Sequence, residues 1–190
     1  MALQVVLFGH SFVRRLKDYI EKNPIHENLG LSALKFEVFF GFGGLSLKQC
    51  RCLHCVDSKL RLSDMVILDI GSNDICNHDY LPQKFAQDLV SYAECLVIGL
   101  PVKRVVIMQL LPRDVLRYSG YNEHVIQVNN LVQALVTSSE LPLTFWKHRG
   151  LWHSKHCIFS RDGIHLGQEV GYPKYLRSIR DCIIRVSNWA

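Results

Sequence analysis

A serine, a histidine and an aspartate stand where they could carry out nucleophilic chemistry. Ser11 follows an apolar run that ends at Gly9, and Asp162 precedes His165 by three residues with Gly163 between them. A turn at Gly163 would let the carboxylate hold one ring nitrogen protonated while the other faces a hydroxyl. This is the relationship that a serine hydrolase needs to activate its nucleophile.

Two interpretations of Ser11 are open on the local pattern. A helix is predicted to begin at Ser11, because apolar residues recur at helical spacing over 12–20. Serine is a common N-cap, so Ser11 could simply cap this helix. Its hydroxyl could instead point outward beside the partly positive helix terminus, where it could react.

The elements that must position these residues alternate between strand and helix. Strands are predicted at 5–8, 34–40, 65–70, 104–111 and 143–146, with helices after Ser11, in part of 45–62, at 82–99, and around 125–135 and 179–186. The alternation predicts a three-layer α/β/α sandwich with a central, mostly parallel five-stranded sheet. Residues 1–190 form a single predicted domain, because 190 residues with 48% hydrophobic content fill one core.

Three of the predicted strands end in polar or glycine-rich loops. Ser11 follows the first strand, Gly44 the second and Asn73 the third. The carboxyl ends of parallel strands meet at one edge of the sheet, where ligand sites of such folds lie. We therefore expect Ser11, Gly44 and Asn73 to lie near one another.

The composition gives little sign of anionic partners, membrane insertion, a disulfide framework or a metal site. A net charge of +5 favours anionic partners only weakly. The chain shows no apolar run long enough to span a bilayer and no signal segment, and its seven cysteines make a disulfide framework improbable, so we expect an intracellular, cytoplasmic protein. The cluster Cys50, Cys52 and Cys55 lacks a clean second half of a zinc site, since only residues 153–157 could complete it, and we predict no metal.

Four stretches resemble, in chain order, the conserved blocks of the SGNH family, also called GDSL-like hydrolases. They are Gly9-His10-Ser11, Gly43-Gly44, Gly71-Ser72-Asn73-Asp74 and Asp162-Gly163-Ile164-His165. The resemblance implies a flavodoxin-like fold, with Ser11 as nucleophile, His165 as base and Asp162 as its partner. It also implies an oxyanion hole formed by the backbone N–H groups of Ser11 and Gly44 (or Gly43, one residue earlier) and the Asn73 amide, with no cofactor.

The same resemblance implies a reaction and leaves one residue without a settled role. Ser11 would attack an ester of a small or lipid substrate, giving an acyl-enzyme that water releases, and short-chain carboxylic esters of acetyl type are the expected substrates. His10 replaces the usual aspartate of the first block. It could contact substrate or support its loop by hydrogen bonding.

A narrower resemblance and a rival function follow from other stretches. Residues 9–16 together with the later blocks look like SGNH domains of animal retroelements, including the first open-reading-frame protein of certain vertebrate LINE elements, which implies self-association through regions outside this chain. Loop 147–156 interleaves basic and aromatic residues. A weakly active or inactive module that binds RNA or anionic lipid through this loop is the alternative.

Overall fold

The computed structural model describes residues 2–40, 46–53, 58–61, 63–76, 81–100, 102–114, 120–152 and 157–188. Its sheet has the order β2-β1-β3-β4-β5, with parallel pairing between each of these neighbours. The strands are β1 (Leu3–Gly9), β2 (Phe36–Phe40), β3 (Met65–Asp69), β4 (Arg104–Met108) and β5 (Leu143–Trp146). The helices are α1 (Ser11–Glu21), α2 (Leu47–Leu53), α3 (Ser58–Arg61), α4 (Pro82–Gly99), α5 (Tyr121–Ser138) and α6 (Gly171–Ser187), with a 3-10 segment, η1 (Pro24–Gly30), after α1.

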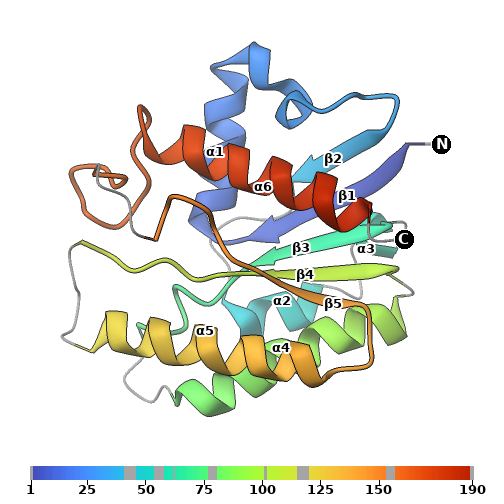
Figure 1. The fold of residues 1–190 in the computed structure, drawn as a ribbon, viewed down its shortest axis with the longest axis vertical. Helices are drawn as coiled ribbons and strands as arrows, with labels where there is room; N and C mark the ends of the chain where they lie inside the picture. The colour runs from blue at the N-terminus through green and yellow to red at the C-terminus, as the bar shows by residue number, and fades with distance from the viewer. Residues whose placement is uncertain are drawn as a thin grey trace.

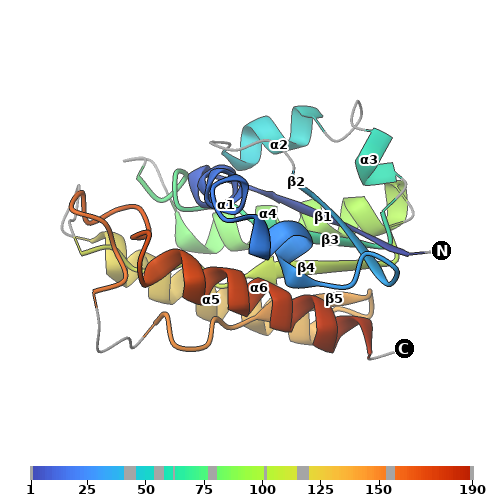
Figure 2. The same ribbon diagram turned by 90° about the horizontal axis from the view of Figure 1, so that it is seen from above.

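Helices cover both faces of the sheet, which confirms the predicted three-layer sandwich (Figures 1 and 2). Successive residues of β1 point to opposite faces: Val5 and Leu7 pack with α1 and α6, whereas Val6 and Phe8 pack with α4 and α5. All four are buried. A strand buried on both faces needs an uninterrupted apolar run, and that is why β1, β3 and β4 are recognisable in the sequence.

Two predicted strands are shorter in the structure. The second begins at Phe36 rather than residue 34, because Leu34 lies in a turn with 91% of its surface exposed. The fourth ends at Met108, because the backbone of Leu110 is hydrogen-bonded through both its N–H and its carbonyl to the side-chain amide of Asn129, at 2.9 Å each. A side chain on α5 thus replaces the strand ladder there.

The structure also bears on the membrane and metal predictions. In the ranges given above, no helix is both long and apolar enough to cross a bilayer. Across those same ranges no three potential metal-binding side chains gather. Cys50 is a buried thiol in the core, whereas Cys55 and the side chain of Cys52 lie outside the described part.

Candidate active site

The turn between β1 and α1 presents Ser11 at the carboxyl edge of the sheet. His10 is the N-cap of α1, and its Nδ1 accepts a hydrogen bond from the backbone N–H of Phe12 at 3.2 Å. Ser11 is therefore the first residue of the helix, and the interpretation of Ser11 as the cap is wrong. The serine remains partly exposed. Because the His10 imidazole caps the helix, the Ser11 hydroxyl is not needed as the capping group.

Gly9 lets this turn lie against the end of β3. A Cβ built on Gly9 would lie 2.4 Å from the carbonyl oxygen of Asp69 and 2.6 Å from Cγ2 of Val13. Instead, the His10 N–H donates to that same Asp69 carbonyl at 3.0 Å. The close approach thus needs a residue without a side chain.

Asp162 and His165 meet in the predicted geometry. Nδ1 of His165 lies 2.7 Å from Oδ2 of Asp162, and Gly163 adopts a φ of +62° within the turn. The other carboxylate oxygen, Oδ1, accepts from the N–H groups of Ile164 and His165 and from the Ser160 hydroxyl. Desolvation would raise the pKa of Asp162, but these hydrogen bonds outweigh it and hold the pKa well below its usual value. Asp162 is thus an ionised partner that can orient the ring.

Several contacts fix the loop that carries this pair. Phe159 and Leu166 form an antiparallel bridge across its base, and the Asp114 N–H donates to the Gly163 carbonyl at 3.0 Å. The ring of His165 packs edge-on against Phe12, the residue after Ser11, with 6.4 Å between centroids. These contacts bring the imidazole to the first turn of α1.

The structure shows no hydrogen bond between Ser11 and His165 among the described residues. Catalytic hydrogen bonds are often long before substrate binds and shorten in the complex. The roles of Ser11, Asp162 and His165 accordingly stay a prediction, supported by neighbouring contacts.

The loop after β3 carries Asn73 at the same edge. Gly71 has a φ of +125°, and the Ile75 N–H donates to its carbonyl at 3.0 Å. Asn73 is exposed, and Asp74 accepts from the Leu47 N–H at the start of α2, at 3.0 and 3.2 Å to its two oxygens. Gly43 and Gly44 lie outside the described residues. Asn73, whose side-chain amide is the proposed oxyanion donor, thus lies exposed on a loop that is anchored through the Asp74 carboxylate.

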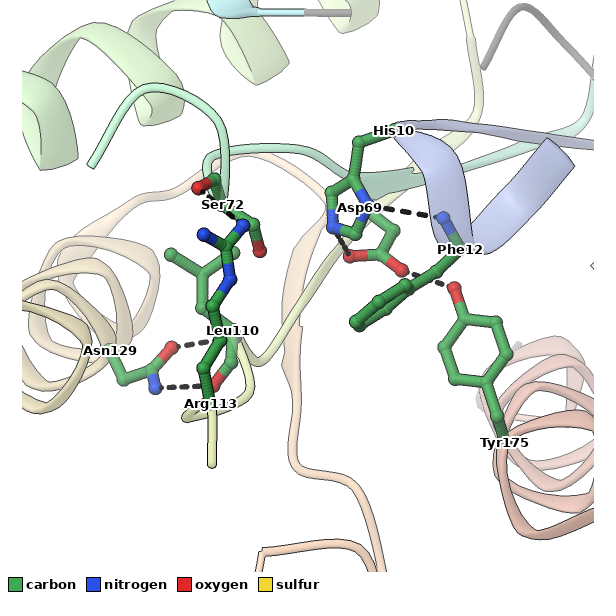
Figure 3. A network of polar contacts seen from close by, with 8 residues as sticks. All are labelled: His10, Phe12, Asp69, Ser72, Leu110, Arg113, Asn129 and Tyr175. Atoms are coloured by element: carbon green, nitrogen blue, oxygen red, sulfur yellow. Dashed lines mark hydrogen bonds and ion pairs between the residues drawn. The ribbon is translucent and has the colours of Figure 1, made fainter. Parts of the chain in front are cut away.

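Arg113 supports this loop, although no motif in the sequence marks it. Its side chain is buried, and its guanidinium donates to the Ser72 carbonyl at 3.1 Å (Figure 3). It also donates to Sγ of Cys76 at 3.0 Å. The guanidinium also lies over the ring of Tyr121, 4.4 Å from its centroid. An arginine beside a predicted strand end was visible in the sequence, but nothing local indicated that it is buried.

In the described part of loop 147–156, some of the interleaved side chains are exposed and others are buried. Lys147 and Arg149 are exposed, and Trp152 is half-buried. His148, in contrast, is buried, and its Nδ1 lies 2.9 Å from the Ser178 hydroxyl. Residues 153–156 lie outside the described part.

Comparisons with known proteins identify the fold. No family model matches the chain, and no curated protein is significantly similar to it. Solved structures do match. They include a GDSL-like lipase from Bacteroides thetaiotaomicron (TM-score 0.72, 16% identity, covering 96% of this chain and 88% of that one) and a lipase/acylhydrolase from Enterococcus faecalis (0.68, 18%, 96% of each).

A carbohydrate esterase of family 3 from Talaromyces cellulolyticus is also similar, with a TM-score of 0.64, 13% identity, and coverage of 99% of this chain and 100% of that one. These matches give no support to the narrower resemblance to retroelement domains. At such low identities the likeness shows the fold. The chain has the α/β fold of the SGNH, or GDSL-like, hydrolases.

Proposed function

We propose that the chain is a serine esterase that hydrolyses short-chain carboxylic esters, of acetyl type, through an acyl-enzyme. The observation that carries the proposal is the 2.7 Å contact between His165 and the ionised Asp162, on a loop packed against the helix that Ser11 begins. Similar solved structures include a lipase, a carbohydrate esterase and an acetyl esterase, and these support ester hydrolysis.

Each residue has a role in the proposed reaction. His165 accepts the proton of Ser11 as its oxygen attacks the ester carbonyl, and Asp162 stabilises the imidazolium that forms. The N–H groups of Ser11 and Gly44 and the Asn73 amide stabilise the negative oxygen of the tetrahedral intermediate. Collapse expels the alcohol, which takes the proton from His165, and water then hydrolyses the acyl-serine.

Covalent labelling tests the proposal. Wild-type protein should be labelled by a fluorophosphonate and should release nitrophenol from nitrophenyl acetate in a burst. Ser11→Ala should abolish both signals, whereas Ser138→Ala, at an exposed serine near the end of α5, should change neither. A wild-type protein without labelling or turnover, or an unchanged Ser11→Ala variant, contradicts the proposal.

A second candidate function is binding of RNA or anionic lipid, favoured by the exposed cations of Lys147 and Arg149 near Trp152. This function predicts an affinity that falls steeply with salt, is reduced by Lys147→Ala/Arg149→Ala, and is unchanged in Ser11→Ala. Filter binding to RNA and sedimentation with anionic vesicles measure it. The absence of measurable affinity for either ligand at low salt would contradict this second function.

A further inference from the structure

Three buried polar side chains lie at or beside the two residues that flank Ser11, and the proposed reaction uses none of them. His10, Asp69 and Tyr175 come from the β1–α1 turn, the end of β3 and α6 (Figure 3). Their exposed fractions are 1%, 2% and 0%. His10 is thus enclosed by protein, which favours support of the loop over direct contact with substrate.

His10 is held through both of its ring nitrogens. Because Nδ1 accepts the Phe12 N–H, a neutral ring carries its hydrogen on Nε2. Nε2 lies 3.2 Å from Oδ1 of Asp69, in a contact whose angle falls short of a well-aligned hydrogen bond. The carboxylate therefore attracts the N–H side of the ring mainly through its charge.

Asp69 is suited to hold the ring because it stays ionised. Burial would raise the pKa of Asp69, but the nearby His10 and the hydrogen bond from the Tyr175 hydroxyl outweigh burial and lower it. The Tyr175 hydroxyl donates to Oδ2 of Asp69. Burial and the Asp69 charge raise the pKa of Tyr175 well above its usual value, so this donor keeps its proton.

The position of the His10 ring determines the position of the first turn of α1. The ring of Phe12 packs against His10, with 4.6 Å between centroids, and against Tyr175 at 6.1 Å, as well as against His165. An imidazole free to rotate would release the Phe12 N–H and this ring. Ser11 lies between His10 and Phe12, so its hydroxyl and N–H would move with them.

We infer that His10 is a positioning residue for Ser11, held in place by Asp69 and the Tyr175 hydroxyl. The imidazole makes the capping contact, and Asp69 supplies a buried carboxylate beside it. The inference rests on the proposed function, since it assigns His10 to the orientation of the nucleophile.

Three variants and a control test it, by the kinetics of nitrophenyl acetate hydrolysis and the rate of fluorophosphonate labelling. His10→Leu should lower kcat roughly 100-fold with KM within about threefold, because misplacing a reacting group by about 1 Å costs that much. His10→Asn restores an acceptor for the Phe12 N–H and should recover about tenfold over His10→Leu. Asp69→Asn should lower kcat about tenfold, because it removes the charge that holds the ring.

Ser178→Ala is the matched control. Ser178 is buried on α6, as Tyr175 is, and its side-chain hydrogen bonds go to Trp146 and His148 rather than to His10 or Asp69. This variant should lower thermal stability and leave kcat within about threefold, because it removes neither the cap of the Phe12 N–H nor the Asp69 charge beside His10.

The kinetics of these variants can overturn the inference in two ways. Folded His10→Leu or Asp69→Asn could keep kcat within about threefold of wild type, or Ser178→Ala could lose as much as His10→Leu. The inference also falls, together with the proposed function, if the wild type shows neither labelling nor turnover. An active wild type with an undiminished His10→Leu variant would leave the proposed function intact.

Discussion

At the scale of single residues, the Asp162–His165 pair is held by hydrogen bonds between residues that are close in the sequence. Asp162 accepts three hydrogen bonds on Oδ1 and the His165 ring on Oδ2, all from residues 160–165. Such local contacts form whenever the turn forms, so this pair could be predicted from its spacing. Asn73 is exposed on a loop whose Asp74 is anchored to Leu47, and its proposed role is to donate a hydrogen bond to the negative oxygen of the intermediate.

Replacing Asn73 by alanine tests that role. We expect Asn73→Ala to lower kcat at least about 100-fold with a smaller change in KM, because an oxyanion donor acts in the transition state. Steady-state kinetics with nitrophenyl acetate measure it. Asn130→Ala, at an exposed asparagine on α5, serves as the control. Retention of more than half of the wild-type kcat in Asn73→Ala would remove Asn73 from the oxyanion hole.

At the scale of elements, the position of Ser11 depends on how closely the end of β1 approaches β3. The pairing register places Gly9 opposite Asp69, so the turn after β1 is held to the strand that leads to Asn73. Arg113 then secures the loop after β3 from the segment that follows β4. Three neighbouring strand ends are thereby joined by contacts that leave Ser11 and Asn73 at the surface.

A single methyl group at Gly9 should disturb this junction. Gly9→Ala would bring a Cβ to 2.4 Å from the Asp69 carbonyl, which is backbone and cannot yield cheaply. We expect a loss of roughly 3 kcal/mol in the free energy of unfolding, measured by urea denaturation.

Gly99→Ala is the control for this substitution. A Cβ built on Gly99 would have nothing within 4 Å, and Gly99 ends α4, so alanine should change stability by less than about 1 kcal/mol. If Gly9→Ala proved as stable as Gly99→Ala, the close approach of β1 to β3 would be disproved.

At the scale of the whole molecule, the buried polar groups make stability depend on pH. His148 is buried against Tyr175, 5.5 Å between ring centroids, and burial lowers its pKa to about 4, although the Asp69 charge opposes the shift. In the unfolded chain the His148 ring takes up a proton near pH 6.5, whereas in the folded chain it does so only near pH 4. Acidification therefore favours the unfolded state across this interval.

We accordingly expect the free energy of unfolding to fall as the pH drops from about 6.5 to 4, by up to roughly 1.4 kcal/mol per pH unit from this group. His148→Asn should flatten that part of the profile, whereas His26→Asn, at a partly exposed histidine, should not. Urea denaturation at several pH values measures this. Parallel profiles for wild type and His148→Asn would show that His148 does not carry the dependence.

The sequence by itself determined the alternation of strands and helices, the bounds of α4 and β5, and the Asp162–His165 pair. These features depend on local properties: apolar runs in the strands, the helical spacing of apolar residues between Pro82 and Gly99, and a turn of four residues at Gly163. Only the tertiary structure decided that His10 rather than Ser11 caps α1, and that Arg113 holds the loop of Asn73. It also decided that Tyr175 donates to Asp69 from 106 residues away. Burial and partners of this kind arise from strand register and helix packing, which bring together side chains whose local sequences carry no sign of one another.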